Sequence, residues 1–292
     1  MKKIAFIGAG IMGKNMIRNL MKEGYEMTVY DIRPEAVEDL VKEGATYCST
    51  LAETAKGQDA VITMVTTPQV VESLYFGEGG ILENADTGTY LIDMTTTEPS
   101  LEVKIYGEAQ KKGLHFMDAP VTGGEFGAIN KSLSILVGGE KADFDACEKL
   151  LLGVGSVVTY EGAVGAGQHT KMGNQIILSG VLEGISEAIA YARVHQLDGK
   201  RFIDSVVGGA AASTQLSQQG MNMENGMYEA GFFIKHFVKD LRIAKKEAEA
   251  SGLKLEMAGN VLRQYETLVD KGMELCGMQA LVQYYLNEYL GK

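Results

Sequence analysis

The chain is poor in the residues that build cross-links and metal sites. Its 292 residues include only three cysteines, Cys48, Cys147 and Cys276, and they lie far apart. An odd, scattered set provides neither a disulfide framework nor a zinc site, and it fits a reducing compartment. The four histidines also lack the spacing of metal ligands. We therefore expect no bound metal and treat the cysteines as small buried hydrophobic residues.

The sequence also lacks basic runs and long apolar runs. Its formal net charge is −11, which argues against a nucleic-acid partner and against an anionic membrane surface. No stretch reaches the roughly 18 apolar residues of a membrane span. The short apolar run at the start is broken by glycines and has no cleavage site of a signal peptide. We therefore expect a cytoplasmic protein with no membrane partner.

The first half alternates short apolar runs with helical patterns. The strands are expected at 4–7, 27–30, 60–64, 90–92, 115–117, 132–137 and 154–160. The helices are expected near 11–23, 34–43, 68–75, 98–112 and 141–152. This alternation predicts an α/β domain of Rossmann type, with a mostly parallel sheet covered on both faces.

After about Gly162 the pattern becomes entirely helical. One long helix is expected from 167 to 195, with a stripe formed by Ile176, Ile177, Val181, Ile185, Ile189 and Ala192. Further helices are expected near 200–208, 213–224, 232–251, 256–271 and 277–290. The sequence therefore predicts a dinucleotide-binding domain over 1–163 and an all-α substrate and oligomerisation domain over 164–292, joined by the long helix. The chain has only four prolines and no low-complexity linker, so the domains should pack tightly. We also expect a homo-oligomer, because an all-helical second domain often builds a dimer interface.

A glycine signature follows the first predicted strand and opens the first helix. It consists of Gly8, Ala9, Gly10, Ile11, Met12 and Gly13, a G-x-G-x-x-G in the context that supports dinucleotide binding. Gly8 permits a tight turn, Gly10 lets the backbone approach a pyrophosphate, and Gly13 lets helix and strand pack closely. The helix N-terminus then offers N–H groups and a positive dipole end to the phosphates.

The choice between NAD and NADP depends on the end of the second strand. Asp31 there can accept hydrogen bonds from the adenine-ribose hydroxyls, which favours NAD, and it would repel a 2′-phosphate. Arg33 lies two residues on and would pair with such a phosphate, or it is an ordinary solvated arginine. We expect NAD as the cofactor, with NADP as the alternative.

Five segments, in this order, resemble the β-hydroxyacid dehydrogenase family over nearly the full length. They are Gly10-Ile11-Met12-Gly13-Lys14-Asn15-Met16, Asp93-Met94-Thr95-Thr96-Thr97-Glu98-Pro99, Asp118-Ala119-Pro120-Val121-Thr122-Gly123-Gly124, Gly165-Ala166-Gly167 with Lys171-Met172-Gly173-Asn174-Gln175, and Phe237-Val238-Lys239-Asp240-Leu241. The resemblance implies that Thr96 lies beside the nicotinamide. It also implies that Lys239 reaches the cofactor and that Asp240 supports that region. We add Val65, which directly follows the predicted strand 60–64, to the cofactor site.

The catalytic residues are expected in the third and fourth segments. A Thr122-Gly123-Gly124 turn bares backbone N–H groups beside a hydroxyl, which suits a carboxylate. The family usually has serine where this chain has Thr122, so the pocket should be narrower. Hydride reduction of a carbonyl leaves an alkoxide that needs a proton, and a buried lysine such as Lys171 can supply it. Asn174 and Gln175 share the lysine's face of the helix, and either amide would position the substrate.

The resemblance implies an oxidoreductase that interconverts a small β-hydroxy acid and its semialdehyde with NAD or NADP. Tartronate semialdehyde (2-hydroxy-3-oxopropionate) reduction is the first choice, because residues 208–214 and 279–285 look most like those reductases. 3-Hydroxyisobutyrate is the second choice. A non-catalytic nucleotide-binding module is a competing class, but it would tolerate loss of Lys171. A sugar-acid phosphate dehydrogenase would need a basic phosphate subsite, and no arginine cluster provides one.

Overall fold

The computed structural model describes residues 1–289 and 291. The backbone divides into two compact units, residues 1–171 and 172–292. The boundary falls inside helix α9 (Ala166–Val194), so one helix belongs to both units. Among the described residues, no helix is long and apolar enough to cross a membrane.

The first unit is built on one mixed sheet whose larger part is parallel. Its strands are β1 (Lys3–Ile7), β2 (Glu26–Tyr30), β3 (Thr46–Tyr47), β4 (Ala60–Thr63), β5 (Tyr90–Asp93), β6 (His115–Asp118), β7 (Val121–Thr122), β8 (Leu133–Gly139) and β9 (Gly155–Gly162). The order is β3-β2-β1-β4-β5-β6-β8-β7, and β9 pairs with β8. Strands β1 to β6 run parallel, whereas β8 is antiparallel to β6 and β7. The predicted mostly parallel sheet is confirmed.

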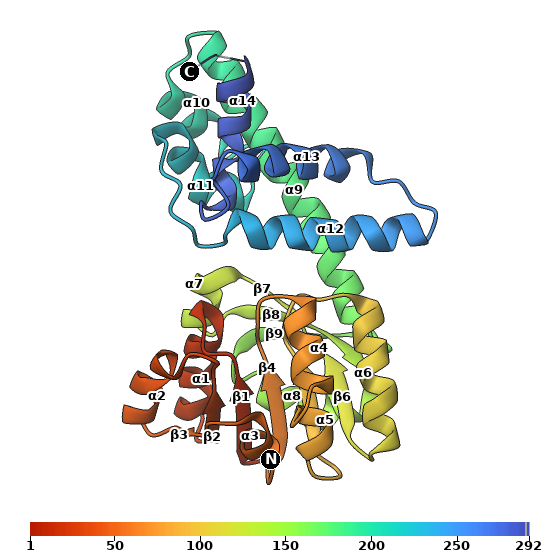
Figure 1. The fold of residues 1–292 in the computed structure, drawn as a ribbon. Helices are drawn as coiled ribbons and strands as arrows, with labels where there is room; N and C mark the ends of the chain where they lie inside the picture. The colour runs from red at the N-terminus through yellow and green to blue at the C-terminus, as the bar shows by residue number, and fades with distance from the viewer. Residues whose placement is uncertain (290, 292) are drawn as a thin grey trace. The chain divides into compact units, whose positions relative to one another are not determined.

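Helices cover both faces of this sheet (Figure 1). Ile4 and Phe6 of β1 belong to a core shared with α1 (Ile11–Lys22), α2 (Glu38–Lys42), α7 (Gly124–Ile129) and α8 (Lys141–Leu151). Ala5 and Ile7 point the other way, into a core shared with α3 (Leu51–Ala55), α4 (Pro68–Phe76), α5 (Ile81–Asn84) and α6 (Pro99–Lys111). Burial on both faces explains why the strands are continuous apolar runs rather than alternating ones.

Among its described residues, the second unit is built from helices joined by turns and loops. Besides most of α9 it contains α10 (Gly199–Val206), α11 (Thr214–Asn225), α12 (Ile234–Ala250), α13 (Glu256–Asp270), the 3₁₀ turn η2 (Met278–Leu281) and α14 (Val282–Tyr289). The helix predicted over 277–290 is thus a 3₁₀ turn followed by an α-helix, and its last position, Leu290, lies outside the described residues. The only β-pairing here is an isolated bridge between Phe233 and Gly277 within residues 172–289.

One detail of the long helix differs from the prediction. Ile185, Ile189 and Ala192 are buried as expected, but Ile177 is 70% exposed, so its place in the buried stripe was wrong. The buried side of the helix runs instead through Gln175, Ser179, Leu182 and Ser186. These polar residues hydrogen-bond within the protein, and a stripe defined by apolar residues alone therefore misses that side.

Several short elements were not predicted, and one predicted helix is divided. The helix expected over 34–43 is a 3₁₀ turn, η1 (Pro34–Ala36), followed by α2. Strands β3 and β7 and helices α3, α5 and α7 contain two to six residues each. Elements this short do not complete two periods of a hydrophobic pattern, so periodicity cannot reveal them.

Candidate active site

The glycine signature forms the turn between β1 and α1. Gly8 has φ +102°, and a Cβ built on it would stand 2.2 Å from the carbonyl oxygen of Met64. A Cβ on Gly13 would stand 1.9 Å from the carbonyl oxygen of Gly8. Packing within the protein therefore requires glycine at both ends of the motif, as the turn and the close helix approach demand.

Gly10, in the middle of the motif, is different. It is exposed, and a Cβ built there would meet no protein atom within 4 Å. Gly10 is the N-cap residue of α1, and no side chain caps this helix end. Open space against an uncapped helix N-terminus is the environment that a dinucleotide pyrophosphate occupies. The residues present therefore fit a nicotinamide dinucleotide.

Asp31, directly after β2, stabilises this turn by a hydrogen bond. It is 9% exposed, and its Oδ2 accepts a hydrogen bond from the N–H of Ala9 at 2.8 Å. Its Oδ1 accepts from the N–H of Arg33 at 2.9 Å. The Arg33 side chain is 63% exposed and lies with Nε 3.6 Å from Asp31 Oδ1. Asp31 and Arg33, the two residues predicted to decide between NAD and NADP, thus lie next to each other.

The loops after β4 and β5 meet beside the glycine turn. The N–H of Val65 donates to Thr95 Oγ1 at 3.0 Å. A Cβ on Gly8 would stand 3.1 Å from Val65 Cγ1, which places Val65 against the turn. Thr96 follows Thr95 and is half-buried. The predicted cofactor residues of the first unit therefore gather at the carboxyl edge of the parallel strands, where open α/β sheets bind ligands.

The Thr122-Gly123-Gly124 segment is a corner between a strand and a helix. Thr122 ends β7, and α7 begins at Gly124. Gly123 and Gly124 have φ of +130° and +62°, a left-handed conformation that side chains disfavour. Both glycines are exposed, so the backbone of this corner is accessible.

Lys171 lies in the second turn of α9 and is 7% exposed. The start of this helix is fixed by Asp118, the last residue of β6. The Asp118 carboxyl accepts hydrogen bonds from the N–H groups of Gly165 at 2.7 Å and Gln168 at 2.8 Å. Burial raises the pKa of Asp118 to about 7 in spite of these hydrogen bonds. The lysine is therefore held on a helix end attached to the sheet, and it does not lie on a solvated face.

A second group of predicted residues is linked within the helical unit. Gln175 is 1% exposed, and its Nε2 donates to Asp240 Oδ2 at 2.6 Å. Its Oε1 accepts from Asn174 Nδ2 at 2.7 Å. Lys239 forms an ion pair with Asp240, with Nζ 3.0 Å from Oδ1. The structure thus brings together Asn174, Gln175, Lys239 and Asp240.

Sequence reasoning missed two polar residues close to these sites. Gln168 and Glu102 are fully buried, and Gln168 Nε2 donates to Glu102 Oε1 at 3.0 Å. A signal for Glu102 was present, because it lies in the stripe of α6 that also buries Leu101, Ile105 and Ala109. An acid inside an apolar stripe indicates a buried polar partner.

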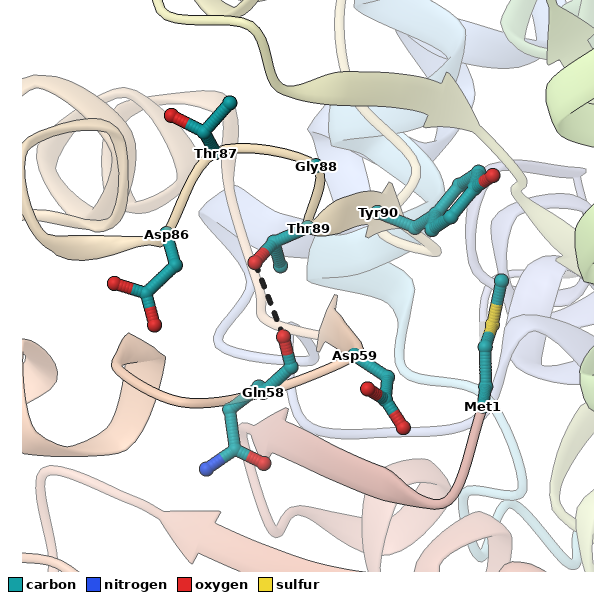
Figure 2. A pocket seen from close by; sticks show the side chains of 8 residues that line it. All are labelled: Met1, Gln58, Asp59, Asp86, Thr87, Gly88, Thr89 and Tyr90. Carbon is teal, nitrogen blue, oxygen red and sulfur yellow. Dashed lines mark hydrogen bonds between the residues drawn. The ribbon is translucent and has the colours of Figure 1, made fainter.

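A surface pocket lies elsewhere on the first unit, and Figure 2 shows the side chains that line it. The lining residues precede or begin β1, β4 and β5, so the pocket lies at the amino edge of the sheet, opposite the glycine turn. Its two acids are used by the backbone: Asp59 accepts from the N–H of Lys3 at 3.1 Å, and Asp86 from that of Gly57 at 2.9 Å. Across residues 1–289 and 291, no cluster of three metal-ligating side chains is found.

Comparison with models of protein families identifies the family of this chain. Residues 3–162 match the model of the NAD-binding domain of 6-phosphogluconate dehydrogenase. Residues 165–285 match the model described as the NAD-binding domain of NADP-dependent 3-hydroxyisobutyrate dehydrogenase. The chain belongs to the β-hydroxyacid dehydrogenase family. It is an NAD(P)-dependent hydroxyacid dehydrogenase, and the resemblance, the Rossmann fold and the cofactor class are confirmed.

Individual relatives cover nearly the whole chain. An uncharacterized oxidoreductase of Bacillus subtilis is 42% identical over 98% of this chain and 99% of its own. The 2-hydroxy-3-oxopropionate reductase of Escherichia coli is 34% identical over 96% of each chain. The structure of Mycobacterium tuberculosis 3-hydroxyisobutyrate dehydrogenase with L-serine superposes with a TM-score of 0.87 at 25% identity, covering 97% of this chain and 98% of that one. The two relatives with named activities differ in substrate, so the comparisons support the family rather than one particular substrate.

Proposed function

We propose that the protein interconverts a small β-hydroxy acid and its semialdehyde, and that tartronate semialdehyde (2-hydroxy-3-oxopropionate) is the substrate. The observation that carries the proposal is the buried amine of Lys171, on a helix end that Asp118 attaches to the sheet. The same unit contains the open cradle at Gly10. Lys171, the proposed proton donor, and Gly10, in the proposed cofactor site, therefore belong to one compact unit.

The cofactor would be held by the glycine turn, Asp31, Val65 and Thr96 in the first unit, with Lys239 as a further contact. When bound, the nicotinamide supplies or accepts the hydride. The buried Asp31 carboxylate favours NAD, because a 2′-phosphate would bring a second negative charge beside it. Arg33 offsets part of that repulsion, which keeps NADP as the weaker alternative.

Three groups would act on the substrate: the Thr122–Gly124 corner, Lys171 and one of the two adjacent amides, Asn174 or Gln175. The exposed backbone corner at Gly123 and Gly124, with the Thr122 hydroxyl, would hold the carboxylate. Lys171 would give a proton to the alkoxide oxygen during reduction and take it back during oxidation. We propose residues 1–163 as the dinucleotide-binding domain, which also supplies the corner at Thr122 to Gly124, and residues 164–292 as the domain for substrate binding and oligomerisation.

Of the two adjacent amides, Asn174 is the one we propose to contact the substrate. A carboxylate only accepts hydrogen bonds, so the NH₂ group of Gln175 must face Asp240. The Gln175 oxygen then faces the Asn174 NH₂ group. Both ends of the Gln175 amide are thus used inside the protein, which makes it a support for Asn174.

3-Hydroxyisobutyrate is the second candidate, since the family model that matches residues 165–285 is described by that activity. The experiment is a panel of initial rates with small semialdehydes, each measured with NADH and with NADPH. The proposal expects the highest kcat/KM with tartronate semialdehyde and NADH. Preference for another semialdehyde would replace the substrate, and no turnover with any of them would favour a non-catalytic nucleotide-binding module.

A further inference from the structure

Three carboxyl groups are fully buried where the sheet meets the start of α9. They are Asp93 at the end of β5, Glu102 in α6 and Asp118 at the end of β6. Burying an ionised carboxylate is costly, and three close together repel one another. The way their oxygens are hydrogen-bonded shows which of them must carry a proton.

Gln168 connects this cluster to the loop that contains Thr96. Its Nε2 donates to the carbonyl oxygen of Thr95 at 2.7 Å and to Glu102 Oε1 at 3.0 Å. Its Oε1 accepts from the N–H of Thr97 at 3.1 Å. One buried amide therefore holds the backbone on both sides of Thr96, and it lies one helical turn before Lys171.

In each of the Asp93 and Glu102 carboxyl groups, only one of the two oxygens accepts hydrogen bonds from N–H or hydroxyl donors. Asp93 Oδ1 accepts from Thr63 Oγ1 at 2.7 Å and from the N–H of Thr95 at 3.1 Å. Glu102 Oε1 accepts from Gln168. Asp93 Oδ2 and Glu102 Oε2 are buried, and no N–H or hydroxyl donor within residues 1–289 and 291 reaches them. The carboxyl groups of Asp93 and Glu102 lie close enough for each to affect the pKa of the other.

One bound proton would supply the donor that these two buried oxygens lack. A carboxylic acid O–H on Glu102 would donate to Asp93 and provide a partner for the unpaired oxygens, while Oε1 stays free to accept from Gln168. Asp93 already accepts two hydrogen bonds, which makes it the better-stabilised carboxylate of the two. Burial, and after it the charges of Asp93 and Asp118, raises the pKa of Glu102 well above its usual range. The other titratable group facing it is Tyr75 of α4, which hydrogen-bonds to Thr63.

We propose that Glu102 is a protonated positioning residue, and that with Gln168 it fixes the loop Thr95–Thr97 against the helix turn that precedes Lys171. The proposal rests on the proposed function for the roles of Thr96 and Lys171. It adds a specific requirement to it: the residue at 102 must both accept from Gln168 and donate to Asp93. A glutamine can do this, since its amide oxygen accepts and its NH₂ group donates, whereas a leucine can do neither.

The test compares Glu102→Gln with Glu102→Leu in the full chain. We expect Glu102→Gln to keep kcat within about twofold of the wild type, and Glu102→Leu to lower kcat about tenfold with a smaller change in the KM for NADH. A folded protein that holds a proton loses stability as the pH rises past the pKa of the unfolded group, roughly 4.3 for glutamate. Glu102→Gln should therefore flatten the fall in unfolding free energy as the pH rises above that value.

An infrared measurement adds a readout that needs no substrate. The comparison is made in an Asp118→Asn background, because Asp118 is itself partly protonated near pH 7. In that background the chain should show the C=O stretch of a protonated carboxylic acid, and adding Glu102→Gln should abolish it. The inference is overturned if that band is absent, or if Glu102→Gln loses activity and stability as Glu102→Leu does. If Lys171→Ala keeps normal turnover while the band is present, the proposed catalytic role fails and the protonated cluster stands.

Discussion

Gln175 donates a hydrogen bond of 2.6 Å to the carboxylate of Asp240, and both side chains are buried. The direction of this bond cannot be reversed, because an ionised carboxylate has no proton to give. It therefore fixes the orientation of the Gln175 amide and, through it, that of Asn174. Under the proposed function, these two adjacent amides would have separate roles: Asn174 would contact the substrate and Gln175 would support it.

This separation predicts different outcomes for the two amides. Asn174→Ala should lower kcat/KM for the semialdehyde roughly 10- to 100-fold, the loss of one hydrogen bond to the reacting substrate, with little change in melting temperature. Gln175→Leu should lower the melting temperature, because it removes a donor from the buried Asp240. Steady-state kinetics and thermal unfolding of both variants check this. Normal kinetics in Asn174→Ala would assign the substrate contact elsewhere.

The role of Lys171 predicts a large loss of turnover without loss of the cofactor. Lys171→Ala should lower kcat roughly 10²- to 10⁴-fold, because the alkoxide no longer receives its proton. Lys171→Arg keeps the charge but holds its proton too strongly to exchange it, so it should rescue little. NADH fluorescence titration should give an unchanged Kd in both variants. Turnover near that of the wild type in Lys171→Ala would refute the assigned role.

The acid at the end of β2 predicts a change in cofactor preference. Asp31→Asn keeps an oxygen that can accept from Ala9, yet it removes the negative charge beside Arg33. The ratio of kcat/KM with NADPH to that with NADH should rise roughly tenfold, because the 2′-phosphate no longer meets a carboxylate. The matched control is Arg33→Ala, which should lower the same ratio. An unchanged ratio in Asp31→Asn would mean that the ribose lies away from this residue.

Gly10 and Gly13 of the turn should respond to alanine in opposite ways. Gly10→Ala meets no protein atom, so we expect an unchanged melting temperature and NADH affinity weakened about tenfold or more by contact with the pyrophosphate. Gly13→Ala would collide with the carbonyl of Gly8, and the melting temperature should fall by roughly 5 °C. Tight NADH binding by Gly10→Ala would contradict the proposed cradle.

The buried Asp118 predicts how stability depends on pH. Its pKa is about 7 in the folded protein, against roughly 3.9 for an unfolded aspartate. Between these values the folded state holds a proton that the unfolded state has released. Raising the pH therefore lowers the unfolding free energy, by at most about 1.4 kcal/mol per unit, until the effect levels off above pH 7.

Urea unfolding of the wild type and Asp118→Asn between pH 5 and pH 8 measures this contribution. Asp118→Asn should be less stable, since it can accept only one of the two backbone hydrogen bonds well, and its stability should decline less steeply with pH. Asp118 is coupled to Asp93 and Glu102, so the difference in slope reports the proton held by Asp118 together with the effect of Asp118 on the pKa of Glu102. Equal slopes would show that Asp118 is ionised throughout.

The sequence predicted those parts of the fold and site that depend on local chemistry. The turn at Gly8 and Gly13 was predictable because its steric demands involve neighbouring backbone atoms. The cluster of Asp93, Glu102 and Gln168 was not, because three separate elements bring it together and only tertiary packing shows the contacts. The predicted burial of Ile177 was wrong for a related reason: polar residues with hydrogen-bond partners inside the protein line the buried side of α9.

The continuity of α9 across the boundary at residue 171 has a consequence for catalysis. Lys171 and Asn174 are three residues apart on one unbroken helix, which separates them by about 4.5 Å along its axis. A hinge movement that leaves the helix intact cannot change that spacing. The proposed proton donor and substrate amide would therefore form a pair whose axial spacing is set by the helix itself.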